Sequence, residues 1–582
     1  MIAPILDPRD GDLEDDAAST KRRSLLQLAG NILAEISLPK LVVVWLMLIG
    51  LPSLLLGSAP LLASVWMTTV LSKALAAFAG IWSVLALVLL VLLGWLGGRR
   101  LLGLAETSFW SLSALAVQPA YALLRESFRH VAEASLAGRI GAPGRARVRA
   151  GAAAASGLLI CVLALGVIVL VWPATRWLGS LADLAAPTRL LPAVLANAVV
   201  LILAYLAAAA IVWGVADATM AQPADHCDFG AAETGRRAWR IAHLSDLHTV
   251  GERYGFRIES GRSGPRGNAR LDLVLARLDE VHAAEPLDVV LITGDLTDAG
   301  RSAEWAEFLS MLTAYPRLAE RIVALPGNHD VNVVDRASPA RMEWPASPTK
   351  RLRRLRTMCA LEALQGGRLR IVDRQSGRLG DTLTEVLRPH AAAIAAFADT
   401  GSPRLWRSLS RLWETVFPLI MPPDPDDGLG IIALDSNAET HFSFTNALGL
   451  VTADQMHAFQ AIVRQYPRAN WIVALHHHVI EYPALASAFF ERVGTALING
   501  TWFVRALQRL TDHAVIMHGH RHIDWIGQCA GLPIISAPSP FMAAGNDCEP
   551  YFYIHTLARA RDGRIALLPP QRIGLCPKTA AG

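Results

Sequence analysis

The first 216 residues contain apolar runs that are too long and too poor in charge for a water-soluble domain. No charged residue occurs between Leu41 and Ser72, and after Lys73 a second run continues to residue 98. About 20 apolar residues in a helix span the hydrocarbon core of a bilayer, whereas helices of this length in soluble proteins have a polar face. These two runs therefore predict a hairpin of membrane-spanning helices, with its turn near residues 57–60.

Two further runs, at about residues 151–172 and 190–216, meet the same criterion, and a segment rich in helix-breaking residues separates them. The region 41–216 is therefore predicted to cross the membrane four times. Polar side chains interrupt the apolar segment 101–124, which is predicted to lie in the membrane interface as an amphipathic helix. The alternative for that segment is a fifth span.

The distribution of arginine predicts the orientation in the membrane. The link 98–150 carries eight arginines against three glutamates, whereas the other links are almost uncharged or balanced. Since cytoplasmic loops are enriched in basic residues, the polar N-terminus (1–40), this link and everything after residue 216 are predicted to be cytoplasmic. The expected location is a bacterial-type inner or plasma membrane. The six cysteines lack the spacing of a disulfide framework or a zinc ribbon, which suits a reducing compartment.

Five short clusters of Asp, Asn and His follow apolar runs that predict strands. The runs are residues 240–244, 289–293, 322–325, 471–475 and 514–517. Because open α/β sheets keep their chemistry at the carboxyl edge, all five clusters are expected at one edge of one sheet. The clusters are, in order, Asp246-Leu-His248, Gly294-Asp295, Gly327-Asn328-His329-Asp330, His476-His477-His478 and Gly519-His520-Arg521-His522.

The rest of the C-terminal pattern predicts an α/β domain. Apolar residues recur at helical spacing within 269–283, between two predicted strands, which is typical of a β-α-β unit. Later apolar runs supply enough strands for a second sheet, so the prediction is a two-sheet β-sandwich flanked by helices. Its boundaries are predicted at residues 237–570, after a linker at 217–236 and before a tail at 571–582.

About a hundred residues, 331–428, interrupt the series of clusters. They have weak strand signals, a proline-rich run and a group of arginines at Arg351, Arg353, Arg354 and Arg356. They are predicted to form a mainly helical insertion that either caps the site or faces anionic lipid. A solvated surface excursion is the alternative.

The residue types in the clusters indicate a site for two divalent cations. Such a pair, about 3.5–4 Å apart, needs a carboxylate that bridges both ions, together with further N and O ligands. Asp295 follows a glycine that frees the backbone to turn, which makes it the candidate bridge, and Asn328 adds a neutral oxygen. Asp, Asn and His together accommodate Mn, Fe, Zn or Co.

The series D-x-H, GD, GNHD, H and GHxH resembles the pattern of the calcineurin-like metallophosphoesterases, over about residues 236–570 apart from the insertion. The resemblance implies that a metal-activated hydroxide attacks phosphorus, that His329 faces the phosphate and that Asp330 fixes the His329 ring. His477 or His478 is the alternative to His476. The implied ligands, which share Asp295, are Asp246, His248, Asp295 and His522 for one metal and Asp295, Asn328, His476 and His520 for the other.

Other polar residues have less specific interpretations. In the loop 250–268, Arg253 and Arg257 are candidates for binding the substrate phosphate, with a solvated basic loop as the alternative. The net charge of +4 is small for 582 residues, and no basic stretch alternates with aromatic residues, so nucleic acid is not an expected partner. The histidines outside the clusters are predicted to be structural: His226, His243, His282, His513 and His555.

These features predict a membrane-anchored phosphohydrolase that cleaves a phosphoester or pyrophosphate bond on the cytoplasmic side. The segment 243–248 resembles the branch of the family that contains cyclic-nucleotide phosphodiesterases and UDP-diacylglucosamine pyrophosphatases, which implies a nucleotide or a lipid-linked phosphate as substrate. One alternative is a non-catalytic membrane sensor or scaffold with a phosphoesterase-like ligand-binding domain. Another is a transporter regulated by that domain, which the lack of charges within the spans disfavours.

Overall fold

The computed structural model divides the chain into two compact units, one ending at Met220 and the other running from Ala221 to the C-terminal residues. Each unit is considered by itself. The structure describes residues 50–77, 118–136, 141–179, 187–230, 237–251, 267–334, 341, 343, 347–440, 443–483, 497–541, 550–560 and 563–575.

The N-terminal unit is mainly helical in its described residues. Three of its helices are long and apolar enough to cross a membrane, over Leu51–Val70, Gly144–Ala174 and Thr188–Ala218. The predicted second span lies almost wholly outside the described residues, as does most of the segment 101–124. The helices are α3 (Leu51–Ala77), α5 (Gln118–Ser135), α6 (Ala142–Val171), the short η2 (Trp172–Ala174) and α7 (Pro187–Ala218).

The predicted turn near residues 57–60 is wrong, because α3 runs unbroken through it with Pro60 inside the helix. The glycine there serves packing instead. A Cβ on Gly57 would lie 1.9 Å from the carbonyl oxygen of Val194 in α7, so the two helix backbones approach closely. Membrane helices tolerate proline where neighbouring helices satisfy the freed backbone groups.

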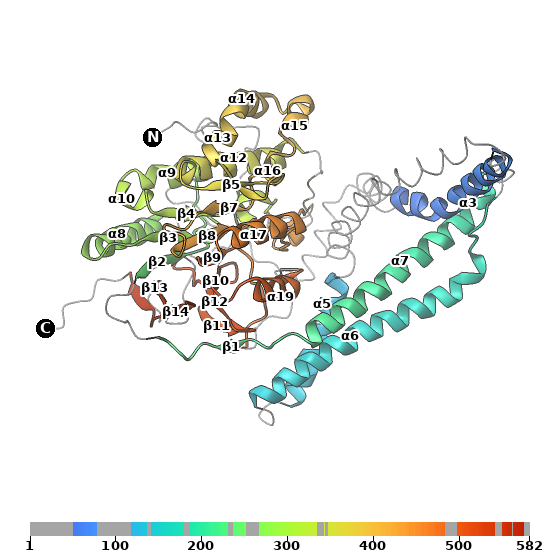
Figure 1. Cartoon of the computed structure of the whole chain (residues 1–582), viewed down its shortest axis with the longest axis horizontal. Helices are drawn as coiled ribbons and strands as arrows, with labels where there is room; N and C mark the ends of the chain where they lie inside the picture. The colour runs from blue at the N-terminus through green and yellow to red at the C-terminus, as the bar shows by residue number, and fades with distance from the viewer. Residues whose placement is uncertain are drawn as a thin grey trace. The chain divides into compact units, whose positions relative to one another are not determined.

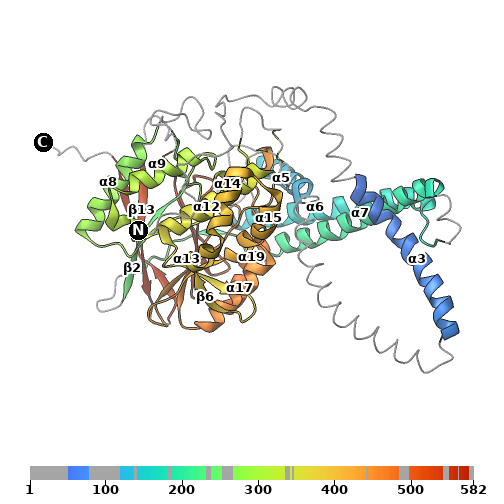
Figure 2. The same ribbon diagram turned by 90° about the horizontal axis from the view of Figure 1, so that it is seen from above.

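Helices α6 and α7 run side by side (Figures 1 and 2). Their backbones meet at two glycines: a Cβ on Gly157 would lie 2.5 Å from the carbonyl oxygen of Ala210, and the Cα atoms of Gly157 and Gly214 lie next to each other. Small residues at such a contact are the usual way in which apolar helices pack in a lipid environment. The loop between them is held by Asn197, whose amide accepts from Arg176 N and donates to Arg176 O, at 3.0 and 2.6 Å.

Helix α5 joins the unit through buried and partly buried ion pairs. Arg125 pairs with Asp217 of α7 at 2.6 Å. Glu133 pairs with Arg129 at 3.1 Å and with Arg149 of α6 at 3.3 Å. Three of the eight arginines in the predicted basic link are therefore held in ion pairs within this unit.

The C-terminal unit contains two mixed sheets, which confirms the predicted two-sheet α/β sandwich. The nine-stranded sheet has the order β1 (Ala224–Asp225), β11 (Trp525–Cys529), β12 (Leu532–Ser536), β10 (Ala514–His518), β9 (Asn470–Ala474), β8 (Leu429–Ala433), β7 (Leu419–Met421), β5 (Arg370–Asp373) and β6 (Arg378–Thr382). The six-stranded sheet has the order β14 (Ile565–Leu567), β13 (Tyr551–Arg559), β2 (Ala238–Leu244), β3 (Val289–Ile292) and β4 (Ile322–Ala324), with β15 (Gln571–Gly574) also paired to β13.

Parallel strands form the centre of each sheet. In the nine-stranded sheet β8, β9, β10 and β12 are parallel neighbours, and in the six-stranded sheet β2, β3 and β4 are. Figure 1 shows α8 and α9 on the side of the six-stranded sheet and α17 and α19 on the side of the nine-stranded one. The helices are α8 (Ala269–Ala284), α9 (Ser302–Leu312), α10 (Pro316–Ala319), α11 (Asn328–Val331), α12 (Pro348–Gln365), α13 (Leu383–Leu387), α14 (Ala391–Thr400), α15 (Pro403–Leu409), α16 (Leu412–Val416), α17 (Ala453–Gln465) and α19 (Gly500–Leu510).

Three stretches predicted to lie outside the sandwich contribute to it. The predicted tail, 571–582, supplies β15, which pairs antiparallel with β13 in the six-stranded sheet. Within the predicted linker, β1 pairs antiparallel with β11 at the edge of the nine-stranded sheet. The stretch 331–428 supplies β5, β6 and β7, which extend the same sheet beyond β8. The insertion is therefore not only helical, because its short strands find partners that the local sequence does not reveal.

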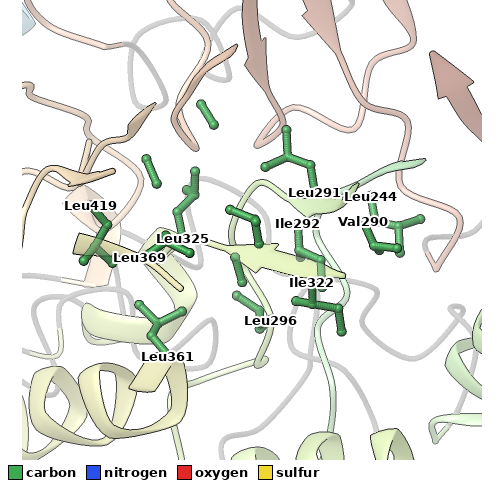
Figure 3. Packing of buried hydrophobic residues seen from close by; sticks show 14 of the residues in the cluster. Leu244, Val290, Leu291, Ile292, Leu296, Ile322, Leu325, Leu361, Leu369 and Leu419 are labelled. Carbon is green, nitrogen blue, oxygen red and sulfur yellow. The ribbon is translucent and has the colours of Figure 1, made fainter. Parts of the chain in front are cut away.

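The four arginines of the insertion are not all available to face anionic lipid, as one of the predictions required. Arg353 and Arg356 are fully buried on α12, and Arg351 and Arg354 lie over the rings of Trp406 and Trp413. Figure 3 shows how the insertion joins the core: Leu361 of α12 lies in the same apolar cluster as Leu325, which follows β4. This part of the insertion is thus integral to the domain.

Candidate metal centre

The structure brings the predicted ligand residues together from both sheets, so the expectation of one edge of one sheet is wrong. The six-stranded sheet supplies the residues that follow β2, β3 and β4, and the nine-stranded sheet supplies those that follow β9 and β10. Within each sheet these strands are parallel, so their carboxyl ends lie at one edge. Contacts of Asp246 with His520 and His522 join the two edges. In strand order the residues are Asp246, His248, Asp295, Asn328, His476, His520 and His522.

One group of possible ligand atoms centres on Asp246. It contains His248 and His522, and the ligand atoms of all three lie within 4.8 Å of one another. His522 Nε2 is 3.2 Å from Asp246 Oδ1, and the backbone N–H of His520 donates to Asp246 Oδ2 at 3.0 Å. The carboxylate of Asp246 is thus held between two residues of the other sheet.

A second group centres on His476 Nε2. This atom is 3.3 Å from Asp295 Oδ2, 3.0 Å from Asn328 Oδ1 and 3.0 Å from His520 Nδ1. Asp295 also lies 3.9 Å from His248 Nε2, through the same Oδ2 atom. That oxygen therefore faces both groups, as a bridging carboxylate would.

Hydrogen bonding to the far ring nitrogen fixes the tautomer of His476. Its Nδ1 lies 2.8 Å from the carbonyl oxygen of Thr293, which can only accept, so Nδ1 carries a proton. The Nε2 atom then faces Asp295, Asn328 and His520. A histidine that donates one N–H to a carbonyl and offers its other nitrogen is the usual arrangement at protein metal sites.

Several of these residues have an uncommon backbone conformation. Non-glycine residues rarely adopt a left-handed φ, and each such residue costs about 1–3 kcal/mol unless its surroundings enforce it. In the described part of the chain, a single residue with this conformation, Ala530, lies outside the clusters. The others are Asp246 (φ 56°), His248 (47°), Asp295 (50°), His520 (74°) and His522 (52°).

Two cluster glycines allow the loops to approach this closely. A Cβ on Gly327 would lie 2.1 Å from both the backbone nitrogen and Oδ1 of Asp295. A Cβ on Gly519 would lie 1.7 Å from Ser245 Oγ and 2.7 Å from Asp246 Oδ2. Any larger residue at either position would push the strand ends apart.

The cluster attracts positive charge. Burial raises the pKa of Asp246, but His522 and His476 lower it more strongly, to about 2. The pKa of Asp295 is likewise held far below its ordinary value, because His476 and His329 outweigh its burial. Burial lowers the pKa of His476, yet Asp295 and Asp246 raise it to about 9. Buried carboxylates that stay ionised need a cation, which protonated histidine or a bound metal can supply.

The resemblance implied that Asp330 holds the His329 ring, but in the structure it does not. Its carboxylate accepts hydrogen bonds from Gly327 N, Leu296 N and Thr297 N and Oγ1, at 2.6–3.2 Å. It therefore joins the loop after β3 to the loop after β4. Burial and the nearby Asp295 raise the pKa of Asp330 to about 6.

Asp298, which the sequence analysis missed, holds the His329 ring instead. Its carbonyl oxygen lies 2.7 Å from His329 Nδ1, and its carboxylate Oδ1 lies 3.4 Å from His248 Nδ1. Together with these two histidines it forms a further group whose possible ligand atoms lie within 4.8 Å. Its place three residues after Asp295 was the available signal, but spacing alone does not separate an orienting residue from an ordinary loop residue.

Among the three adjacent histidines, the structure places only His476 in the cluster of carboxylates. His477 Nδ1 lies 2.9 Å from Ser436 Oγ, and His478 Nε2 lies 3.5 Å from Glu481. The candidate substrate residues Arg253 and Arg257 lie outside the described residues.

Two of the predicted structural histidines are fully buried between strands. His243 of β2 and His555 of β13 have ring centroids 5.9 Å apart. Burial lowers the pKa of His555 to about 3 and that of His243 well below its ordinary value. Both are therefore neutral core residues at physiological pH.

The two mixed sheets and the Asp/His clusters at their joined edges define a metal-dependent phosphoesterase domain. The family model described as calcineurin-like phosphoesterase matches residues 240–385, which include β2, β3, β4 and the clusters that follow them. The chain contains a calcineurin-like metallophosphoesterase domain.

Among the solved structures similar to the chain, three each share 11% sequence identity with it. They are a dimetal phosphatase from Danio rerio (TM-score 0.34, covering 58% of this chain and 99% of that one), a putative 5'-nucleotidase from Staphylococcus aureus in complex with alpha-ketoglutarate (0.31, 59% and 55%) and a purple acid phosphatase from yellow lupin, Lupinus luteus, seeds (0.27, 60% and 57%). The chain spans nearly all of the first and just over half of the other two. No curated protein matches the chain.

Proposed function

We propose that the chain is a membrane-anchored phosphohydrolase that uses two divalent cations and acts on the cytoplasmic side. The observation that supports this most directly is the convergence on His476 Nε2 of a carboxylate, an amide oxygen and a second imidazole, within 3.0–3.3 Å. The donors suit a borderline transition metal such as Mn, Fe, Zn or Co. His520 Nε2, which is buried, has no hydrogen-bond partner among the described residues and leaves a further nitrogen for such an ion.

The two cations share Asp295 in this proposal. Asp246, His248 and His522 complete one site, and the other is completed by residues of both sheets. When bound, two such ions activate a water molecule near neutral pH and neutralise charge on the phosphate. The residues that complete the second site are Asn328, from the six-stranded sheet, and His476 and His520, from the nine-stranded sheet.

His329 contributes through its Nε2 atom. Because its Nδ1 donates to the carbonyl oxygen of Asp298, the ring orientation is set and Nε2 is the nitrogen that we propose faces the substrate. There it stabilises charge on the transferred phosphoryl group or supplies a proton to the leaving oxygen. Asp330 acts indirectly: its hydrogen bonds join the two loops that carry Asp295 and His329.

The proposed substrate is a phosphorylated nucleotide or a lipid-linked phosphate. Three long apolar helices in the same chain support a membrane location, and an enzyme at the bilayer surface can take a lipid-linked substrate from it. Arg253 and Arg257 remain candidate phosphate-binding residues.

The test is hydrolysis by the purified full-length protein in detergent with added Mn. The panel should include artificial phosphomonoesters and phosphodiesters, cyclic nucleotides and a nucleotide-diphospho-lipid, and the products show which bond breaks. We expect turnover that Asp295→Asn reduces by at least about 100-fold, with unchanged membrane insertion. If the unmodified protein binds metal but hydrolyses none of these substrates, the chain is instead a non-catalytic sensor or scaffold.

A further inference from the structure

Helix α12, from the stretch predicted to be an insertion, contacts the backbone of both loops that flank the metal centre. Arg356 Nη1 donates to the carbonyl oxygen of Gly300 at 2.8 Å, in the loop that follows β3. The next residue, Thr357, has its Oγ1 3.2 Å from the carbonyl oxygen of Asp330, in α11 after β4, and 2.9 Å from the carbonyl oxygen of Arg353 in its own helix. Two successive residues of one helix therefore lie against these two segments, and Arg356 holds the first of them by a hydrogen bond.

The same helix also holds the strand that leads into the second loop. Gln365 accepts from Ala324 N and donates to Ala324 O, both at 2.7 Å. Ala324 is the last residue of β4, the edge strand of its sheet, so the amide takes the place of a further strand. This fixes the backbone three residues before Gly327.

The two loops touch each other where α12 meets them. A Cβ on Gly300 would lie 2.4 Å from the carbonyl oxygen of Asp330 and 3.0 Å from Arg353 Cδ, and Gly300 has a left-handed φ of 67°. Gly300 lies two residues after Asp298, whose carbonyl oxygen orients His329. A shift of the Gly300 carbonyl would therefore move the oxygen on which the His329 ring depends.

Burying the guanidinium of Arg356 at this position is unfavourable for folding. Only 1% of Arg356 is exposed. Its buried neighbours Leu352 and Cys359 are apolar, and the neighbouring Arg353, equally buried, is also a cation. A buried charge is unfavourable unless hydrogen bonds compensate it, and an apolar side chain of the same length would fill the space without that cost. The hydrogen bond to the carbonyl oxygen of Gly300 is one contact that offsets this cost.

We propose that Arg356 is a positioning residue for the reaction: by fixing the loop 298–300 against α12, it sets the orientation of His329 toward the substrate. This rests on the proposed hydrolase function. It also makes α12 part of the catalytic framework rather than a surface addition to it.

The experiment is a double-mutant cycle between Arg356 and His329 in the full-length protein. Arg356→Met keeps the length of the side chain and removes its donors, and we expect kcat to fall by about 10–100-fold. KM, the amount of bound Mn and the midpoint of thermal unfolding should stay close to those of the unmodified protein. In a His329→Ala background the same substitution should change kcat by less than about threefold, because the group that Arg356 positions is absent.

Two variants guard against a trivial result. Arg351→Met is the matched control, since Arg351 lies on the same helix but over the ring of Trp406, 4.5 Å from its centroid. Arg356→Lys retains the charge and one donor, and we expect it to recover much of the lost kcat. If Arg356→Met does not fold, Arg356→Leu, which also lacks donors, replaces it in the cycle.

The outcomes separate the two proposals. An active unmodified protein in which Arg356→Met behaves like Arg351→Met overturns the positioning role alone. So does a loss of kcat that is equally large with and without His329, which would show a general structural effect. Absence of hydrolysis by the unmodified protein overturns the proposed function, and the role of Arg356 falls with it.

Discussion

At the scale of single residues, the metal centre depends on strained backbone conformations as well as on the chemistry of its side chains. Five of the seven predicted ligands have a left-handed φ, between 47° and 74°. Such conformations persist only where surrounding contacts enforce them, as the bonds from His520 N to Asp246 and from His329 N to Asp295 do here. The strain is thus offset by hydrogen bonds between the loops.

The three adjacent histidines provide a test of that geometry. We expect His476→Gln to lower bound Mn and hydrolysis by about 100-fold or more, because Nε2 of His476 contacts every other member of its group. His478→Gln should change either quantity by less than about threefold, since that ring faces Glu481. Metal analysis and kcat of the two purified variants check this, and a reversal of their order would reassign the ligand.

His555 should make the C-terminal domain sensitive to acid. Its pKa is about 3 in the folded protein because of burial, and about 6.5 in an unfolded chain. Between these values the unfolded chain binds a proton that the folded protein does not, so stability is intact above pH 6.5 and falls as the pH drops toward 3. The loss from this residue is roughly 1.4 kcal/mol per pH unit.

We expect His555→Phe to lose less stability than the unmodified protein as the pH falls from 6.5 to 4.5. Thermal unfolding midpoints of both proteins across this range measure the effect. Parallel pH profiles for the two proteins would mean that His555 does not set the acid sensitivity. Burial and the nearby His555 also lower the pKa of His243, so His243 adds acid sensitivity of the same sign.

At the scale of elements, the packing of the helices depends on close backbone contacts that the local sequence does not predict. Helix α6 contains Gly157 and Gly166 within one apolar run, and the sequence around them does not distinguish the two. A Cβ on Gly157 would collide with α7, whereas a Cβ on Gly166 would meet nothing within 4 Å. Packing therefore decides which glycine matters.

Substitution of these two glycines tests the α6–α7 contact. We expect Gly157→Leu to lower the thermal midpoint of the detergent-solubilised protein, because the side chain would force the helix backbones apart. Gly166→Leu is the matched control, and its midpoint should stay within about 2 °C of the unmodified protein, as surface changes usually do. Equal midpoints for the two variants would contradict the packing described here.

At the scale of the whole molecule, the chain combines a hydrolase domain with helices suited to a bilayer. Three described helices are long and apolar enough to span, and the arginine-rich link predicts that the C-terminal domain is cytoplasmic. Three of its arginines are ion-paired within the helical unit. The orientation prediction, which counts them as loop charges, therefore needs a direct measurement.

Cys227 offers a reporter of orientation, because it is exposed and follows the last helix closely. In a variant that keeps only this cysteine, we expect a membrane-impermeant maleimide to label permeabilised cells and not intact ones. Labelling of intact cells would place the domain outside. In both cases the protein should stay in the membrane pellet after alkaline carbonate extraction, since about 20 buried apolar residues per span anchor it firmly.

The sequence alone determined the features that depend on local pattern. Apolar runs without charge identify spanning helices, and a short strand followed by Asp, Asn or His identifies a ligand cluster, because both signals lie within about 20 neighbouring residues. The five clusters, and the choice of two sheets for the fold, follow from such signals. They specify which residues take part, and not where each strand pairs.

Only the tertiary structure decided how these pieces meet, because strand pairing and helix packing join residues that are far apart in the chain. It divided the clusters between two sheets, drew β5, β6 and β7 from the predicted insertion into one of them and set His476 apart from its neighbours. It also gave Asp298 and Arg356 their contacts with the catalytic loops. Their partners lie 31 and 56 positions away, beyond the reach of any local pattern.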